Sequence, residues 1–214
     1  MAKAVKQKNI LNSISKGLYH TEWTQFKRRV ILPCQPENIP QELKAIPQWG
    51  AWVCQAPPTE YPLKSITKAN KRTSEPQRMV ELGSFENALD ALSSGNYDGL
   101  VFEVKKGSGP VAVQFPQCRD PSTGEILKNT LDLVKRLGSY TEINPLGTSI
   151  TLWGYDPHAI GIDYKGRIGT HVEGWLTLTG HSIHSLPLAD ISEFTRTISA
   201  QVLGDLMGQI LGEV

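Results

Sequence analysis

Residues 111–127 read VAVQFPQCRDPSTGEIL and join a short apolar strand to a tight polar turn and the start of a helix. Side chains alternate between the two faces of a strand, so Gln114 and Pro116 belong to the same face. A strand that ends just before such a turn is a common place for carboxylates that hold a metal ion. Here the two positions carry an amide and a proline. The stretch therefore predicts a strand–turn–helix unit without a carboxylate pair.

The sequence on either side of this unit predicts several helices. Apolar residues at helical spacing, with capping residues at the ends, predict helices within 40–46, 84–95, 123–138 and 189–211. Ser84 is the expected N-cap of the second of these helices, and Gly138 is the expected stop of the third.

Strand patterns fall between these helices. They cover residues 51–54, 97–104 and 111–115, two strands within 139–154, and a hairpin around Lys165 and Gly166 with a longer strand within 159–180. The spacing of 97–104 and 111–115 predicts that these two strands form a hairpin. Residues 55–83 lack periodicity and are expected to form a long loop. The pattern predicts the α+β class, with a mostly antiparallel sheet and flanking helices.

Composition and cysteine usage indicate the cellular compartment of the protein. The chain has 214 residues, of which 20% are charged, and its N-terminus lacks the apolar core of a secretory signal. No apolar run has the length that a membrane span needs. Cys34, Cys54 and Cys118 are widely spaced and form no CxxC pair, which favours a reducing compartment. We therefore expect a cytoplasmic protein without a membrane partner.

Charge is distributed unevenly along the chain. Residues 1–35 contain seven Lys and Arg residues and one acid, a net charge of +6, whereas the remainder has 15 basic and 20 acidic residues. This predicts a basic N-terminal arm, 1–35, followed by a domain, 36–214. The arm could contact nucleic-acid phosphates, with Lys16, Lys27, Arg28 and Arg29 as candidates, or it could be a solvated terminus only.

Six segments occur in an order that is typical of one family. They are NIPQELKAIPQWGAWV, SFENALDAL, NYDGLVF, RDPSTGEIL, LGSYTEINPLGTS and WLTLTGHSI. With this ordered set, roughly residues 38–185 resemble the primase–polymerase domain of plasmid and phage replication proteins, the bifunctional branch of the archaeo-eukaryotic primase superfamily. No single segment is specific, and the resemblance depends on the whole set. It implies a fold built for two-metal nucleotidyl transfer with magnesium or manganese.

The resemblance also indicates which positions would carry this chemistry. The two acids of the family's first motif correspond to Gln114 and Pro116. The small residue and the histidine of the second motif, which help to bind the triphosphate, correspond to Ser149 and Thr151. Glu173 matches the third acid, and Gly174 stands where an arginine is common. Because most of these ligands are missing, we expect no catalytic residue, no metal site and no cofactor.

Several residues have alternative interpretations. Glu103, Asp120 and Glu173 could form a rebuilt set for one metal ion, or Glu173 could simply be an exposed strand residue. His181 and His184 lack a third ligand nearby in sequence and are interpreted as structural or solvent-facing. The YTE and TLTG segments are expected to meet packing and turn requirements.

Three functions remain open from the sequence. The first is a catalytically inactive primase–polymerase homologue that serves as a DNA-binding or replication-associated accessory protein of a mobile element, with DNA and a separate replicative helicase as its partners. The second is residual nucleotide binding or nucleotidyl transfer at a rebuilt site. The third is a structural module that dimerises through its last helix or binds another protein. The sequence does not set the oligomeric state.

Overall fold

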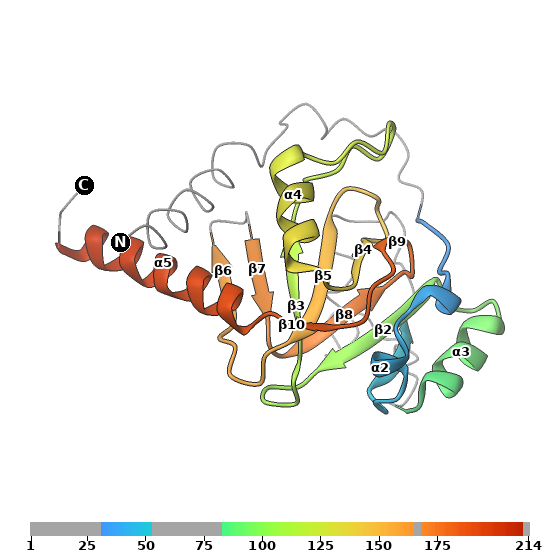
Figure 1. The fold of residues 1–214 in the computed structure, drawn as a ribbon. Helices are drawn as coiled ribbons and strands as arrows, with labels where there is room; N and C mark the ends of the chain where they lie inside the picture. The colour runs from blue at the N-terminus through green and yellow to red at the C-terminus, as the bar shows by residue number, and fades with distance from the viewer. Residues whose placement is uncertain (1–30, 53–82, 165–167, 212–214) are drawn as a thin grey trace, which may run out of the picture.

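Two mostly antiparallel sheets with helices against them make up the part of the chain that the structure describes (Figure 1). The computed structural model describes residues 31–52, 83–164 and 168–211. The α+β class predicted from the sequence is confirmed. Lys16, Lys27, Arg28, Arg29, Cys54, the predicted loop up to residue 82 and the hairpin tip at Lys165–Gly166 lie outside the described residues.

The smaller sheet has three strands in the order β1-β2-β8, and the larger sheet has the order β6-β7-β3-β5-β4-β9. A short strand, β10, runs parallel to β5, and the other pairs are antiparallel. The strands are β1 Trp49–Trp52, β2 Gly99–Val104, β3 Pro110–Phe115, β4 Thr141–Ile143, β5 Ile150–Tyr155, β6 Ile162–Tyr164, β7 Ile168–His171, β8 Gly174–Leu178, β9 Ser182–His184 and β10 Ala189–Asp190.

Local signals set the helices. They are the 3-10 helix η2 Pro36–Asn38, α2 Gln41–Lys44, α3 Phe85–Ser93, α4 Lys128–Leu137 and α5 Ser192–Leu211. The Ser84 hydroxyl accepts the Asn87 backbone N–H at 3.3 Å, which confirms the predicted cap of α3. Gly138 ends α4 with φ 60°, a left-handed conformation that glycine adopts at little cost, as predicted. None of the described helices is long and apolar enough to cross a membrane.

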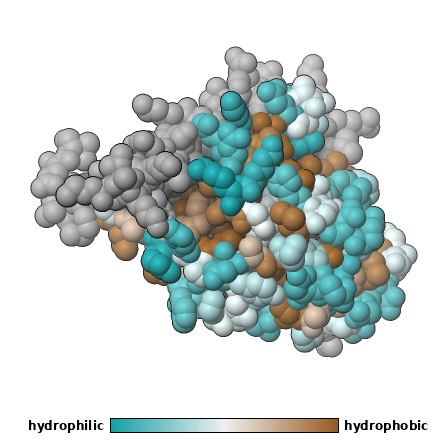
Figure 2. Space-filling view, viewed as in Figure 1, coloured by the Kyte–Doolittle hydropathy of each residue, from teal (hydrophilic) through white to brown (hydrophobic). Residues whose placement is uncertain are grey.

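Helices α4 and α5 cover one face of the larger sheet (Figure 1). Alternate residues of β3, among them Val113 and Phe115, pack there with Val134 of α4 and Ile198 of α5. In the same view, Figure 2 shows apolar surface between α4 and the start of α5. This helical side of the sheet is therefore the main apolar core.

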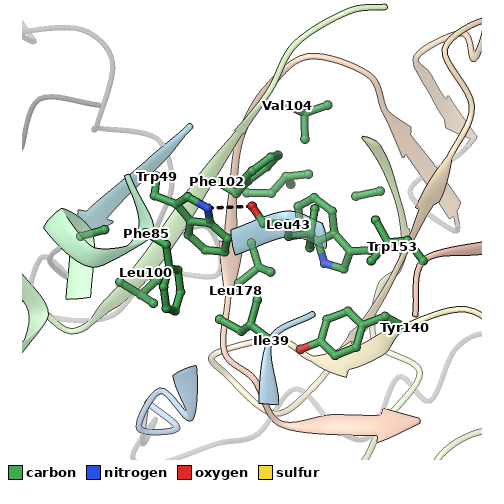
Figure 3. Close-up of a cluster of buried hydrophobic side chains, with 14 residues drawn as sticks. Ile39, Leu43, Trp49, Phe85, Leu100, Phe102, Val104, Tyr140, Trp153 and Leu178 are labelled. Carbon is green, nitrogen blue, oxygen red and sulfur yellow. Dashed lines mark hydrogen bonds between the residues drawn. The ribbon is translucent and has the colours of Figure 1, made fainter. Parts of the chain in front are cut away.

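The opposite face of the larger sheet packs against the smaller sheet. The rings of Trp49 and Phe102 lie 5.2 Å apart, and those of Phe102 and Trp153 lie 5.8 Å apart, both edge-to-face (Figure 3). The Trp49 indole N–H donates to the Leu43 carbonyl at 3.0 Å, which ties α2 to this cluster (Figure 3). A second aromatic core thus joins the two sheets.

The predicted hairpin of 97–104 with 111–115 is wrong. β2 pairs with β1 and β8, whereas β3 pairs with β5 and β7. The physical reason is the aromatic core: Phe102 of β2 packs edge-to-face against Trp153 of the larger sheet, so β2 lies across from that sheet and not beside β3. The connection between β2 and β3 therefore takes the chain from one sheet to the other.

The helix predicted within 123–138 begins later, at Lys128. Asp120 accepts the Ser122 N–H at 2.8 Å, and Gly124, at φ 79°, donates to the Asp120 carbonyl at 2.8 Å. A bridge between Arg119 and Ile126 closes this turn. The polar turn therefore extends over residues that the apolar spacing alone assigns to the helix.

Residues 31–35, which the sequence analysis assigned to the basic arm, are hydrogen-bonded to the domain. Leu32 donates its N–H to the Pro145 carbonyl at 2.8 Å, and Gln35 donates to the Thr179 carbonyl at 2.7 Å. The His181 ring nitrogen lies 2.6 Å from the Pro33 carbonyl oxygen, so its N–H can donate there. In the structure, this stretch packs as part of the domain.

Candidate functional site

A row of residues from adjacent strands crosses the larger sheet at the position of Gln114. Gln114 of β3 pairs with Thr151 of β5 and with Gly169 of β7. Thr151 pairs in turn with Glu142 of β4, and Gly169 pairs with Asp163 of β6. Directly paired residues point to the same face of a sheet. We call these five residues the polar row; it lies on the face opposite α4 and α5.

The family motifs match five positions, and four of them gather where β3 ends and β5 begins. Gln114 and Thr151 are direct partners in the row, and Pro116 follows β3. Ser149 precedes β5, and its hydroxyl accepts the Gln117 N–H at 3.0 Å. Gln117 has φ 49°, a strained value for a residue with a side chain. The motif correspondence thus describes one place in the fold.

Glu173 is not brought to this place. It is exposed and lies in the connection between β7 and β8. Because His171 pairs with Ala112 and β7 is antiparallel to β3, the chain beyond His171 runs toward the start of β3, away from Pro116. The β7 residue opposite Gln114 is Gly169, which has no side chain to offer. The interpretation of Glu173 as an exposed residue agrees with this placement.

Glu142 is the buried acid of the row, with 1% of its surface exposed. Its Oε2 accepts hydrogen bonds from the Tyr140 hydroxyl at 2.8 Å, the Thr179 N–H at 3.1 Å and the Gly180 N–H at 2.9 Å. Burial raises the pKa of Glu142 to about 7, and the hydrogen bonds from Gly180, Tyr140 and Thr179 oppose that shift. The carboxylate therefore joins the YTE segment to the TLTG segment, in line with the packing role expected for both.

His171 is a row neighbour that the sequence analysis missed. Its Nε2 lies 3.0 Å from the position that a Cβ would take at Gly169, so the ring leans over the glycine toward the row. Burial lowers the pKa of His171, and the negative charge of Asp163 opposes that shift. The imidazole is therefore mainly neutral at pH 7. The sequence did hold one signal for this placement: His171 is two residues from Gly169 on a strand, so the two residues share one face.

Three side chains of this region make no hydrogen bond to any described residue. They are Gln114, Thr151 and His171, which lie on β3, β5 and β7 respectively; no side-chain partner is found for them among residues 31–52, 83–164 and 168–211. Thr151 is only 3% exposed. Gln114 and His171 are partly exposed, so their polar groups are within reach of solvent.

The alternative metal set of Glu103, Asp120 and Glu173 is spread over different elements. Glu103 lies on β2 in the smaller sheet, 3.1 Å from the Lys105 ammonium, and Asp120 organises the turn after β3. His181 contacts the Pro33 carbonyl. Within the described part of the chain, no group of three or more His, Cys, Asp or Glu side chains is placed to hold a metal ion.

The described residues and the rest of the chain differ in their balance of basic and acidic residues. The described ranges contain 8 Lys and Arg residues and 16 Asp and Glu residues, whereas residues 1–30, 53–82 and 165–167 contain 14 basic residues.

A comparison of the chain with protein-family models and with curated proteins found no match. The resemblance to primase–polymerase domains therefore depends on the ordered sequence motifs.

Proposed function

We propose that this chain is a catalytically inactive primase–polymerase homologue that acts as a DNA-binding or replication-associated accessory protein of a mobile element. The observation that carries the proposal is the polar row: Gln114 and Thr151, which the family resemblance matches to a metal ligand and a triphosphate ligand, are paired with each other, and Gly169 faces Gln114 from β7.

Ligand chemistry supports loss of catalysis at this row. Magnesium needs several oxygen ligands in near-ideal octahedral geometry and dehydrates reluctantly. Gln114 offers one neutral amide oxygen, Thr151 offers a hydroxyl, and Gly169 offers no side chain. The Glu142 carboxylate is buried and already accepts three hydrogen bonds. A two-metal centre that activates a primer oxygen and a leaving pyrophosphate would need more carboxylates than these.

Charge distribution supports contact with DNA through the basic segments. The described residues carry twice as many acids as bases and would repel phosphates, whereas residues 1–30 contain Lys27, Arg28 and Arg29 in succession. Basic residues that neutralise phosphates release counterions, which gives binding without sequence preference and with a steep salt dependence.

Fluorescence anisotropy with single- and double-stranded DNA at several salt concentrations tests this proposal. A variant with Lys27, Arg28 and Arg29 all changed to Ala should bind more weakly and with a flatter salt dependence. The matched control changes three exposed cations of α4, Lys128, Lys135 and Arg136, to Ala and removes the same charge. No DNA binding by the unmodified chain would overturn the proposal and favour a protein-interaction module.

A further inference from the structure

We propose that residues 31–35, which we call the strap, form a latch that opens as pH rises, with Glu142 as the group whose ionisation opens it. This inference goes beyond the proposed function and holds whether or not the chain binds DNA. It begins from the hydrogen bonds that tie the strap to one turn of the domain, residues 178–181, and from the buried acid that binds the same turn.

The strap lies directly on this turn. Gln35 donates its N–H to the Thr179 carbonyl at 2.7 Å, and the Cys34 thiol donates to the Leu178 carbonyl at 3.6 Å. A side chain at Gly180 would overlap the Gln35 carbonyl oxygen, so the two backbones are in contact. The strap and the turn therefore hold each other in place.

The strap can open without unfolding of the domain. None of its side chains is fully buried: Pro33 is exposed, and the other four are half-buried. The next buried side chain along the chain is Ile39, which packs in the aromatic core. Segments with few buried apolar contacts open at a lower free energy than the domain as a whole. Opening should therefore stop before Ile39.

Glu142 binds the same turn from the larger sheet. Its Oε2 accepts the N–H groups of Thr179 and Gly180 at 3.1 and 2.9 Å, and burial raises its pKa to about 7. The titratable groups that face it are Tyr140 from its own strand and Cys34 from the strap. The strap therefore contributes to the cover that keeps water from this acid.

Neither of these neighbours ionises near pH 7. Burial and then the charge of Glu142 raise the pKa of the Cys34 thiol to about 12, and they raise the pKa of Tyr140 well above its ordinary value. Glu37 of η2 adds a smaller effect on Cys34, and Thr151 of β5, which pairs with Glu142, is uncharged. Of these groups, only Glu142 changes its charge between pH 5 and pH 8.

The sign of the effect follows from burial. In the closed form the pKa of Glu142 is about 7, and water that enters on opening lowers it toward the ordinary 4.5. The proton therefore favours the closed form below pH 4.5, and this advantage is lost as pH rises through 7. A pKa that is lower by one in the open form raises the ratio of open to closed chains about tenfold.

Opening changes how closely the basic residues before the strap are held to the domain. In the closed form, the first backbone hydrogen bond to the domain among the described residues is that of Leu32 to Pro145. Opening moves the last fixed point of the chain to Pro36, and four more free residues add up to about 14 Å of reach. The latch therefore sets the reach of residues 1–30.

Amide hydrogen exchange by NMR between pH 5 and pH 8 tests the latch. The exchange rates of Leu32 and Gln35, each divided by its intrinsic rate at that pH, should rise about tenfold or more in the unmodified chain. Asp156, whose N–H donates to the Gly109 carbonyl at 2.9 Å, reports the domain and should stay more protected at every pH.

Two variants and one control assign the titrating group. Glu142→Gln should remove the pH dependence of strap opening, whereas Glu86→Gln, at an exposed position of α3, should keep it. His181 is the other titratable residue at the strap, because its ring contacts the Pro33 carbonyl at 2.6 Å. His181→Gln should loosen the strap and leave its pH dependence in place.

The outcomes decide for or against the latch. Strap amides that exchange no faster than Asp156, or whose opening does not vary with pH, would overturn it. So would a pH dependence that survives Glu142→Gln or disappears in His181→Gln. Where Glu142→Gln does not fold, the carboxyl carbon of Glu142 in the unmodified chain decides: its NMR titration should share the midpoint of strap opening, and separate midpoints would overturn the inference.

Discussion

The Glu142 carboxylate accepts the backbone N–H of Gly180 at 2.9 Å, although the two residues are 38 positions apart. Glu142 lies on β4 of the larger sheet, and Gly180 follows β8 of the smaller sheet. The same turn receives the N–H of Gln35 at the Thr179 carbonyl. One buried acid therefore connects both sheets and the segment at residues 31–35.

This connection predicts a stability that falls as pH rises. The unfolded chain has an ordinary Glu142 pKa near 4.5, and the folded chain has one of about 7. Between these values the unfolded chain loses the proton first, so ionisation favours unfolding. Stability from this group should fall by about 3 kcal/mol between pH 4.5 and pH 7 and change little above that range.

Urea unfolding of the unmodified chain and of Glu142→Gln at pH 5, 6, 7 and 8 measures this effect. The amide keeps an acceptor for the backbone N–H groups and cannot ionise. The difference between the two free energies of unfolding should therefore shift in favour of Glu142→Gln by a few kcal/mol as pH rises. A difference that does not vary with pH would show that Glu142 titrates normally in the folded chain.

Gly180 should tolerate no side chain. Its φ is 71°, and a Cβ there would lie 1.9 Å from the Gln35 carbonyl oxygen, which belongs to the backbone and cannot simply rotate away. Gly180→Ala should therefore lower the free energy of unfolding by several kcal/mol. Gly95→Ala is the control, because Gly95 has a similar φ of 76° with open space around it, and should cost about 1 kcal/mol. Equal losses at both positions in urea unfolding would contradict the close approach.

Local signals explain what could be predicted of the fold. Ser84 and Gly138 mark helix ends through their own conformations, and the two strands expected within 139–154 are β4 and β5, which pair across a short turn. These features need only neighbouring residues. The pairing partner of β2 cannot be predicted from neighbouring residues, because it depends on the contact of Phe102 with Trp153 of the other sheet.

The candidate site was predictable only in part for the same reason. Family order brought Gln114, Pro116, Ser149 and Thr151 to attention, and the structure gathers them at one end of two strands. His171 could be recognised only from the structure, in which β7 pairs it with Ala112 and its ring lies over Gly169, the residue opposite Gln114. The sequence analysis expected a packing role for the YTE segment but not the buried acid Glu142, which accepts N–H groups almost forty residues later.

Divalent ions should not bind at the predicted motif positions. Gln114 and Pro116 supply no carboxylate, and Glu173 lies away from both. We expect no magnesium or manganese binding there at millimolar concentration, by calorimetric titration, and no difference between the unmodified chain and Glu173→Ala. Tight binding that Glu173→Ala abolishes would place a metal site where the register puts none.

Restored acids should bind metal without restoring synthesis. Gln114→Asp with Pro116→Asp supplies two carboxylates at the end of β3 and should bind manganese weakly. Gly169 still offers no third ligand, and Thr151 cannot become a cation for a triphosphate. Primer-extension assays of the double variant should show no product. Product formation would mean that the missing triphosphate contacts matter less than we infer.

The basic arm gives the last prediction, which the structure makes more precise. Removal of residues 1–35 would also remove the hydrogen bonds of Leu32 and Gln35 to the domain, so the informative deletion ends at residue 30. That deletion takes away seven basic residues and one acid, Glu22, and leaves the net acidic described residues in place. DNA affinity should drop, because the cations that neutralise phosphates are gone.

Salt dependence separates this loss from a general loss of folding. Each neutralised phosphate contributes a slope of roughly −0.9 in log affinity against log salt on duplex DNA, so loss of several contacts should flatten the plot as well as lower it. Circular dichroism and the urea midpoint of the deletion variant should match those of the unmodified chain, since residues 31–35 remain. Gel shifts at several salt concentrations decide the outcome: an unchanged slope would place the DNA surface on the basic residues of 53–82 and 165–167 or on the domain itself.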